Sequence, residues 1–264
     1  MNSGLLDKIN SGKNVMILAM DHALAYGAIK GLSHQKELIS QLSGTGISGY
    51  LVSPAMARTY FADQEFSSKI RIIPRVDYYI SKMSLPYAYE KEAYGLLISP
   101  EEVKEIGADT AIMSLVFGYN DSSTQINNIT EVSKYANACA RLGLTLIVET
   151  VMWGSRVVPG EEKIIENIAN IARIGAELGA NIIKAPFFGD SDAYRFVVNE
   201  CPVPVTILGG PRVNSDDDVI KSVAEGVQAG VKGIVFGRNI WQSSDPISLS
   251  EKLLKVLENA PIAK

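Results

Sequence analysis

One lysine stands at the end of a run of apolar residues, where its chemistry would differ from that of a lysine on a solvated surface. Residues 180–186 read Ala-Asn-Ile-Ile-Lys-Ala-Pro, which predicts a short buried strand with Lys184 at its carboxyl-terminal tip. A lysine in such a place is costly unless it is paired or neutral. Partial burial makes a lysine amine a nucleophile toward carbonyl groups, with which it forms a Schiff base. The alternative is a lysine whose ammonium group reaches from the strand into solvent.

Other polar residues also follow apolar runs. They are Asp21 and His22, Ser53, Asp77, Glu149, Gly209 and Gly210, and Gly237 and Arg238. Asp21 and Glu149 are candidates for proton transfer or for holding substrate hydroxyl groups. The alternatives are a helix cap for Asp21 and an ion pair with Lys184 for Glu149, and a carboxylate near the lysine would also tune it. We hypothesise that burial raises the pKa of Glu149 toward neutrality, so that this carboxyl group moves a proton.

Two segments near the C-terminus combine glycine with arginine. Residues 208–212 read Leu-Gly-Gly-Pro-Arg, and residues 236–239 read Phe-Gly-Arg-Asn. In β/α barrels, backbone N–H groups in the loops after the last two strands often bind phosphate. We therefore predict that Gly209, Gly210, Gly237 and Arg238 surround a phosphate group. The alternative is that the glycines serve tight turns only.

These candidate residues need a scaffold that gathers the ends of several strands. Apolar runs predict eight strands, at residues 15–20, 48–53, 70–74, 109–115, 144–149, 180–186, 203–208 and 232–236. Helical patterns lie at residues 3–13, 35–42, 100–106, 125–142, 161–178, 216–229 and 248–257. Strands buried on both faces that alternate with helices indicate a parallel α/β sheet, and eight such units in about 250 residues are typical of a (β/α)₈ TIM barrel. An open doubly wound sheet is the alternative. The tyrosine-rich residues 77–97 are expected to form a loop and a helix.

Composition favours one soluble domain over residues 1–264. Hydrophobic residues make up 47% of the sequence, an ordinary share for a globular protein. The formal charge of −4 argues against nucleic acid or an anionic membrane as a partner.

Charged residues interrupt the start of the chain, which argues against a signal peptide, and no apolar run reaches the roughly 18 residues of a membrane span. We therefore expect no membrane association and a cytoplasmic location.

Cysteine and histidine are too few to predict a metal centre. Cys139 and Cys201 lack the spacing of a metal or redox site, and we expect two structural thiols in a reducing compartment. His22 and His34 have no carboxylate at matching spacing. The sequence therefore predicts neither a metal nor another cofactor.

Several motifs together resemble the archaeal-type class I fructose-bisphosphate aldolases, a family that includes 2-amino-3,7-dideoxyheptulosonate synthases and autoinducer-2 phosphate thiolases. The motifs lie at residues 18–22, 107–109, 183–184, 188–190, 201–205, 209–211 and 237–240, so the resemblance spans nearly the whole chain. It implies that Lys184 is the Schiff-base lysine and that Asp21 lies at the reacting end of the substrate. It also implies that the glycine–arginine segments surround the phosphate of a phosphorylated sugar and that the protein forms a homo-oligomer.

Two residues depart from the family pattern. Ala23 stands where the family usually has glycine, and Trp153 lies at or near the place of a tyrosine that donates and accepts a proton in the aldolase members. The thiolase members also lack this tyrosine. Because an indole cannot accept a proton, we expect Trp153 to wall the substrate pocket, which His22 also lines. Glu149 would then carry out part of the proton transfer that the tyrosine performs in the aldolase members.

The expected function is a metal-independent Schiff-base aldolase that cleaves or forms a C–C bond in a phosphorylated ketose such as fructose 1,6-bisphosphate. Two alternatives stay open. They are a related transaldolase- or thiolase-type transferase acting on another sugar phosphate, and a sugar-phosphate-binding barrel without catalysis. A metal-free isomerase would share the phosphate segments but would have no need of Lys184.

Overall fold

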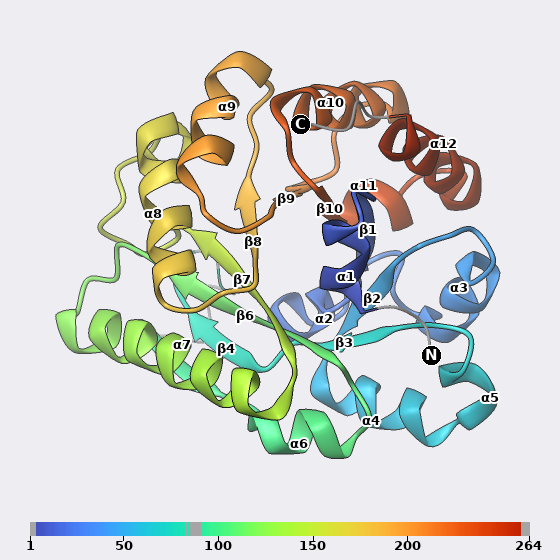
Figure 1. Cartoon of the computed structure of the whole chain (residues 1–264), viewed down its shortest axis with the longest axis horizontal. Coiled ribbons are helices and arrows are strands. Elements are labelled where there is room, and N and C mark those ends of the chain that lie inside the picture. The colour runs from blue at the N-terminus through green and yellow to red at the C-terminus, as the bar shows by residue number, and fades with distance from the viewer. Residues whose placement is uncertain (1–3, 83, 85–90, 260–264) are drawn as a thin grey trace.

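Eight parallel strands form the centre of the fold, and the prediction of a (β/α)₈ barrel is confirmed (Figure 1). The computed structural model describes residues 4–82, 84 and 91–259. The barrel strands are β1 (Val15–Ala19), β2 (Gly49–Val52), β3 (Ile72–Pro74), β6 (Thr110–Val116), β7 (Thr145–Val151), β8 (Ile182–Pro186), β9 (Val205–Leu208) and β10 (Gly233–Phe236). Their order in the sheet is β3-β2-β1-β10-β9-β8-β7-β6. A parallel bridge between Arg75 and Ile112 joins the two edges, so the barrel is nearly closed.

Helices surround the strands in Figure 1. Those that match the predicted segments are α1 (Leu5–Asn10), α3 (Gln35–Leu42), α6 (Pro100–Glu105), α7 (Ser122–Leu142), α8 (Ile165–Glu177, after the 3-10 turn η1, Glu161–Lys163), α10 (Asp216–Ala229) and α12 (Pro246–Glu258). The sequence analysis missed α2 (His22–Tyr26), α4 (Pro54–Ala62), α5 (Gln64–Ser67), α9 (Ser191–Glu200) and α11 (Arg238–Trp241). Three of these carry clear start signals, since the Ser53, Asp63 and Asp190 side chains accept backbone N–H groups of α4, α5 and α9. Serine and aspartate are preferred at this capping position.

The expectation of a loop and a helix over residues 77–97 is wrong where the structure describes this segment. β4 (Asp77–Ile80) and β5 (Ala93–Leu96) pair as an antiparallel hairpin, and residues 83 and 85–90 lie outside the described residues. Tyrosine suits such a half-buried pleated surface. Because β4 follows β3 after two residues, Tyr78 and Tyr79 come to line a cleft at the carboxyl-terminal end of the barrel.

Side chains inside the barrel form two layers of different character. The lower layer is an apolar cluster that includes Ile73, Ile112, Ile147 and Ile182 together with Leu5 and Ile9 of α1. Two positions further along the same four segments stand Arg75, Ser114, Glu149 and Lys184. Because side chains two residues apart on a strand point to the same face, this polar layer lies directly above the apolar one. The barrel is therefore apolar at its amino-terminal end and charged at its carboxyl-terminal end.

A close backbone approach fixes the segment that carries Trp153. A Cβ atom on Gly154 would lie 1.9 Å from the carbonyl carbon of Gly118 and 2.2 Å from the nitrogen of Tyr119. The Gly154 N–H also donates to the Phe117 carbonyl oxygen at 3.0 Å. The loops after β6 and β7 therefore touch main chain to main chain, and only glycine fits at position 154.

We predict that Gly154→Ala lowers the free energy of unfolding by about 3 kcal/mol, the upper range for overpacking, because two backbone segments must move apart. Urea denaturation measures this change. Gly95→Ala on β5 is the control, because a Cβ atom there meets nothing within 4 Å. A Gly154→Ala midpoint equal to that of the wild type would contradict the predicted contact.

Candidate active site

The strand register places Lys184 beside Glu149. Ser114 pairs with Glu149, Glu149 with Lys184, and Lys184 with Thr206. Paired residues of neighbouring parallel strands face the same side of a sheet, so these four side chains form one row inside the barrel. Lys184 is only 5% exposed, and β8 continues to Pro186. Lys184 therefore lies within the strand and not at its tip, which corrects the sequence prediction. The alternative of an ammonium group extended into solvent does not hold.

Glu149 holds two cations at once. Its Oε1 lies 2.6 Å from the Lys184 Nζ, and its Oε2 accepts a hydrogen bond from Arg75 Nη2 at 2.5 Å. Burial alone would raise the pKa of Glu149, but the adjacent Lys184 and Arg75 outweigh it and lower this pKa to about 2. The hypothesis that burial moves this carboxyl group toward neutrality is wrong. The alternative interpretation, an ion pair with Lys184, is what the structure shows.

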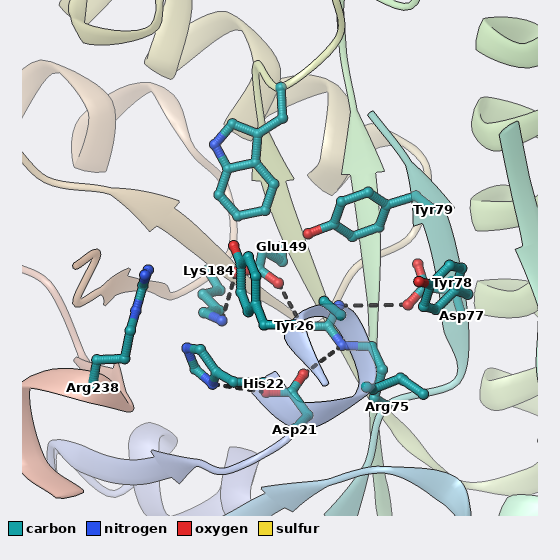
Figure 2. Close-up of a pocket in the computed structure, with 13 residues that line it drawn as sticks. Asp21, His22, Tyr26, Arg75, Asp77, Tyr78, Tyr79, Glu149, Lys184 and Arg238 are labelled. Atoms are coloured by element: carbon teal, nitrogen blue, oxygen red, sulfur yellow. Dashed lines mark hydrogen bonds and ion pairs between the residues drawn. The ribbon is translucent and has the colours of Figure 1, made fainter. Parts of the chain in front are cut away.

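The sequence analysis missed Arg75, which lies at the centre of the site (Figure 2). This side chain is buried, and its Nε donates to Asp21 Oδ2 at 2.9 Å. Its Nη1 donates to Ser114 Oγ at 2.7 Å and lies 3.5 Å from Asp77 Oδ1. The available signal was a charged residue directly after an apolar run, the same signal that singled out Lys184.

Asp21 and Asp77 both face Arg75. Asp21 stands at the N-cap position, directly before α2, but its side chain makes no capping hydrogen bond. Its carboxylate pairs with Arg75 instead, so the cap interpretation fails. Asp77 is buried and accepts the Ser114 N–H at 2.6 Å. Burial raises the pKa of Asp77 to about 6, although Arg75 and this hydrogen bond oppose the shift.

His22 is held as a neutral imidazole. Burial lowers its pKa to about 4, against the opposing effect of the Asp21 carboxylate, whose Oδ1 lies 3.6 Å from His22 Nδ1. The ring contacts Trp241 edge-on at 5.4 Å between centroids. A Cβ atom on Gly237 would lie 2.5 Å from His22 Cε1. Gly237 therefore makes room for the imidazole ring, a role that the sequence analysis did not assign to it.

Arg238 is the member of the predicted phosphate site that lines the cleft with Lys184. Its guanidinium carbon lies 5.7 Å from the centre of the Tyr26 ring. Within the part of the chain that the structure describes, its buried Nε has no hydrogen-bond partner. Arg238 thus offers unused hydrogen-bond donors to an anion in the cleft.

The other predicted phosphate residues lie beside the cleft. Asn239 Nδ2 donates to the Gly209 carbonyl oxygen at 2.5 Å, which ties the loop after β9 to the loop after β10. Gly210 has a φ of +63° and open space around its Cα. Arg212 pairs with Asp216 at 2.5 Å and so supports its own loop. The two segments are therefore adjacent in space, and phosphate binding by Gly209, Gly210 and Gly237 stays a prediction.

Aromatic side chains wall the cleft above this charged floor. Tyr26, Tyr78, Tyr79 and Trp153 line it, and the rings of Tyr79 and Trp153 lie 5.9 Å apart between centroids. Figure 2 shows the Tyr79 hydroxyl directed into the cleft. The cleft is open to solvent at its mouth and encloses about 580 Å³ of empty space when that mouth is included.

Some predictions concern features away from the cleft. Among the residues that the structure describes, no three histidine, cysteine, aspartate or glutamate side chains are placed to hold a metal ion. No described helix is both long and apolar enough to cross a bilayer. Cys139 and Cys201 are buried and free. The cytoplasmic location and the homo-oligomer stay predictions.

Comparisons with known proteins identify the family. Residues 15–243 match the family described as DeoC/LacD family aldolase. The chain belongs to this family and is an aldolase. The resemblance inferred from the sequence motifs is thereby confirmed, since the relatives include a class 1 fructose-bisphosphate aldolase of Thermoproteus tenax, 27% identical over 93% of this chain and 90% of that protein.

Two further relatives and one solved structure extend the comparison. An uncharacterized aldolase of Saccharolobus solfataricus is 26% identical over 94% of this chain and 92% of its own length. The 2-amino-4,5-dihydroxy-6-oxo-7-(phosphonooxy)heptanoate synthase of Streptomyces griseus is 23% identical, with coverage of 93% and 85%. An archaeal fructose-1,6-bisphosphate aldolase, solved with its catalytic lysine bound to a carbinolamine intermediate, superimposes with a TM-score of 0.83 at 24% identity over 97% of this chain and 100% of that one. That likeness supports the barrel fold.

The low pKa of His22 predicts a pH-dependent loss of stability. Its folded-state pKa of about 4 lies below the ordinary value of 6.5, so the unfolded chain binds more protons between these values and stability falls as the pH drops through this window. From pH 7 to pH 5 we expect the wild type to lose about 2 kcal/mol more than His22→Gln in urea unfolding. His34→Gln, at an exposed position, should retain the wild-type loss. Equal losses in the wild type and His22→Gln would refute the burial of a neutral His22.

Proposed function

We propose that this aldolase forms a Schiff base between Lys184 and the carbonyl carbon of a phosphorylated ketose. One observation carries the proposal: Lys184 is a buried lysine on the floor of a cleft, 2.6 Å from the carboxylate of Glu149. The cleft lies at the carboxyl-terminal end of the barrel strands, where barrel enzymes carry their active sites. A lysine in this environment is suited to covalent catalysis on carbonyl compounds.

The proposed reaction begins when the neutral Lys184 amine attacks the carbonyl carbon and water leaves. The resulting iminium draws the electrons of the adjacent C–C bond, which breaks as the substrate hydroxyl group loses its proton, so that an aldehyde leaves and an enamine remains on Lys184. Protonation of the enamine carbon and hydrolysis of the new iminium by water then release the second product and the free lysine. Glu149 stays ionised and stabilises the positive nitrogen of the iminium as it stabilises the ammonium. Asp21 Oδ1, the oxygen that Arg75 does not contact, is the proposed proton acceptor, directly or through water. The reverse sequence forms the bond.

The relatives support a phosphorylated substrate. The names of the Thermoproteus and Streptomyces relatives specify a bisphosphate and a phosphonooxy compound, and Arg238 offers unused donors in the cleft. Fructose 1,6-bisphosphate is our first candidate. A transferase acting on another sugar phosphate is the second, and it is favoured by Trp153 at the place of the family's tyrosine.

We predict that Lys184→Met abolishes both borohydride trapping and C–C cleavage, because the amine that forms the adduct is gone. Intact-mass spectrometry after borohydride treatment with a panel of ketose phosphates measures trapping. Lys134→Met removes a lysine that is 71% exposed on α7 and should trap like the wild type. An adduct of the same mass in folded Lys184→Met would disprove the assignment.

Arg238→Ala tests the phosphate assignment. We expect KM for a phosphorylated ketose to rise about 10- to 100-fold, since a hydrogen bond to a charged group contributes about 1.5–3 kcal/mol. The unphosphorylated ketose should show little change. Arg195→Ala, at an exposed site on α9, is the matched control. An equal rise for both substrates would remove Arg238 from the phosphate site.

A further inference from the structure

Arg75 has contacts that neither the proposed Schiff-base chemistry nor phosphate binding uses. We propose that Arg75 is a positioning residue that orients Asp21 and Glu149 and limits the attraction of the surrounding carboxylates for the Lys184 ammonium. Its relevance to catalysis rests on the proposed function. Its effect on Lys184 can be measured without any substrate.

The contacts of Arg75 come from four different segments, three in the barrel and one in the hairpin β4–β5. Its Nε holds Asp21 after β1, its Nη2 holds Glu149 of β7, and its Nη1 meets Ser114 of β6 and Asp77 of β4. A guanidinium group presents five N–H donors in a rigid plane, whereas a lysine offers a single point charge. The arrangement therefore requires arginine, and it fixes the direction in which each carboxylate faces.

The backbone of Arg75 is itself anchored at the seam of the barrel. Its N–H donates to the Val52 carbonyl oxygen at 2.8 Å, and the residue bridges Ile112 on the opposite edge of the sheet. The next residue, Val76, donates its N–H to the Ile112 carbonyl oxygen at 3.0 Å. The guanidinium group thus projects from a point that β2 and β6 hold on both sides, as a positioning role demands.

Arg75 reduces the net negative charge of the carboxylate cluster that lies beside Lys184. Asp21, Asp77 and Glu149 are the carboxylates of this cluster, and Arg75 and Lys184 are the cations in contact with them. Without Arg75, Lys184 would be the cation that contacts this cluster, through Glu149. Nearby opposite charges favour the ammonium form over the nucleophilic amine. Arg75 contacts one oxygen of Glu149 and one of Asp21, so it balances one of these three negative charges.

The other titratable groups of the site do not take over the role of Arg75 as a counter-charge to the carboxylates. They are His22, Tyr26, Tyr78, Tyr79, Tyr94 and Arg238. Burial lowers the pKa of His22 to about 4 and raises the pKa of Tyr79 and of Tyr94, so these three groups are neutral near pH 7. Arg238 lies beside Tyr26 and, among the contacts that the structure shows, makes none with the three carboxylates. Arg75 is therefore the cation that contacts all three.

Competitive labelling with acetic anhydride tests the inference. The labelling rate of Lys184 is followed against pH by peptide mass spectrometry, with the exposed Lys134 as the internal reference. In Arg75→Gln we expect the pH of half-maximal labelling of Lys184 to rise by about one unit or more, which means about tenfold slower labelling at a fixed pH below the midpoint. Arg75→Lys should restore part of the shift because it restores the charge.

Further variants control for the loss of an arginine elsewhere in the barrel and for a failure of Arg75→Gln to fold. Arg71→Gln removes an arginine that pairs with Asp109 at 3.1 Å near the amino-terminal end of the barrel, and it should leave the Lys184 midpoint unchanged. If Arg75→Gln does not fold, the double variant Arg75→Gln/Asp77→Asn removes one buried charge of each sign. The double variant should still show the higher midpoint relative to Asp77→Asn alone.

The outcomes separate this inference from the proposed function. An unchanged Lys184 midpoint in a folded variant without Arg75 would overturn the role of Arg75, whatever the enzyme's substrate. A shifted midpoint in an enzyme whose wild type traps no ketose phosphate would overturn the proposed function and support the role of Arg75. If kcat falls in Arg75→Lys while KM stays nearly unchanged, the result would also show that the orientation of Asp21 and Glu149 matters for the reaction.

Discussion

The carboxylate of Glu149, shared between Lys184 and Arg75, is the interaction on which the rest of the site depends. Burying charges is costly unless each has a partner at short distance, and the distances of 2.6 Å and 2.5 Å satisfy this condition. The arrangement requires the register that sets Glu149 beside Lys184. It also requires a barrel that closes, since Arg75 reaches Glu149 from the far edge of the sheet.

The need to pair every buried charge also explains why the inside of the barrel has one apolar layer and one charged layer. The isoleucines of the lower layer, with Leu5 and Ile9 of α1, exclude water from one end. The charged layer above them is accordingly accessible from one direction only, through the cleft. There the loops and the hairpin β4–β5 supply the tyrosines, Trp153 and Arg238. A ligand in this cleft meets fixed charges in a setting where electrostatic interactions are stronger than in water.

Much of this arrangement could be predicted from sequence, because its signals are local. Strands buried on both faces read as apolar runs, and a lysine within such a run is conspicuous. The nearness of Lys184 and Glu149 followed from their positions on consecutive strands. The central place of Arg75 did not, because it depends on the meeting of β3 and β6, which no local pattern encodes. The wrong direction for the pKa of Glu149 has the same cause: burial was visible in the sequence, but the second cation was not.

The low pKa of Glu149 also bears on how the proposed reaction could proceed with Trp153 at the place where the sequence resemblance leads us to expect a tyrosine. A carboxylate that stays ionised is a poor proton carrier near neutral pH, because efficient acid–base groups have a pKa close to the working pH. In the proposed reaction, however, the nitrogen of Lys184 carries a positive charge both as an ammonium and as an iminium. A permanently ionised Glu149 can therefore stabilise the positive charge that forms on the nitrogen during condensation without reorganising. Before condensation the same carboxylate favours the ammonium form, the effect that we propose Arg75 limits. Proton transfer is then the proposed role of Asp21, while the ion pair of Glu149 with Lys184 keeps the reacting nitrogen in place.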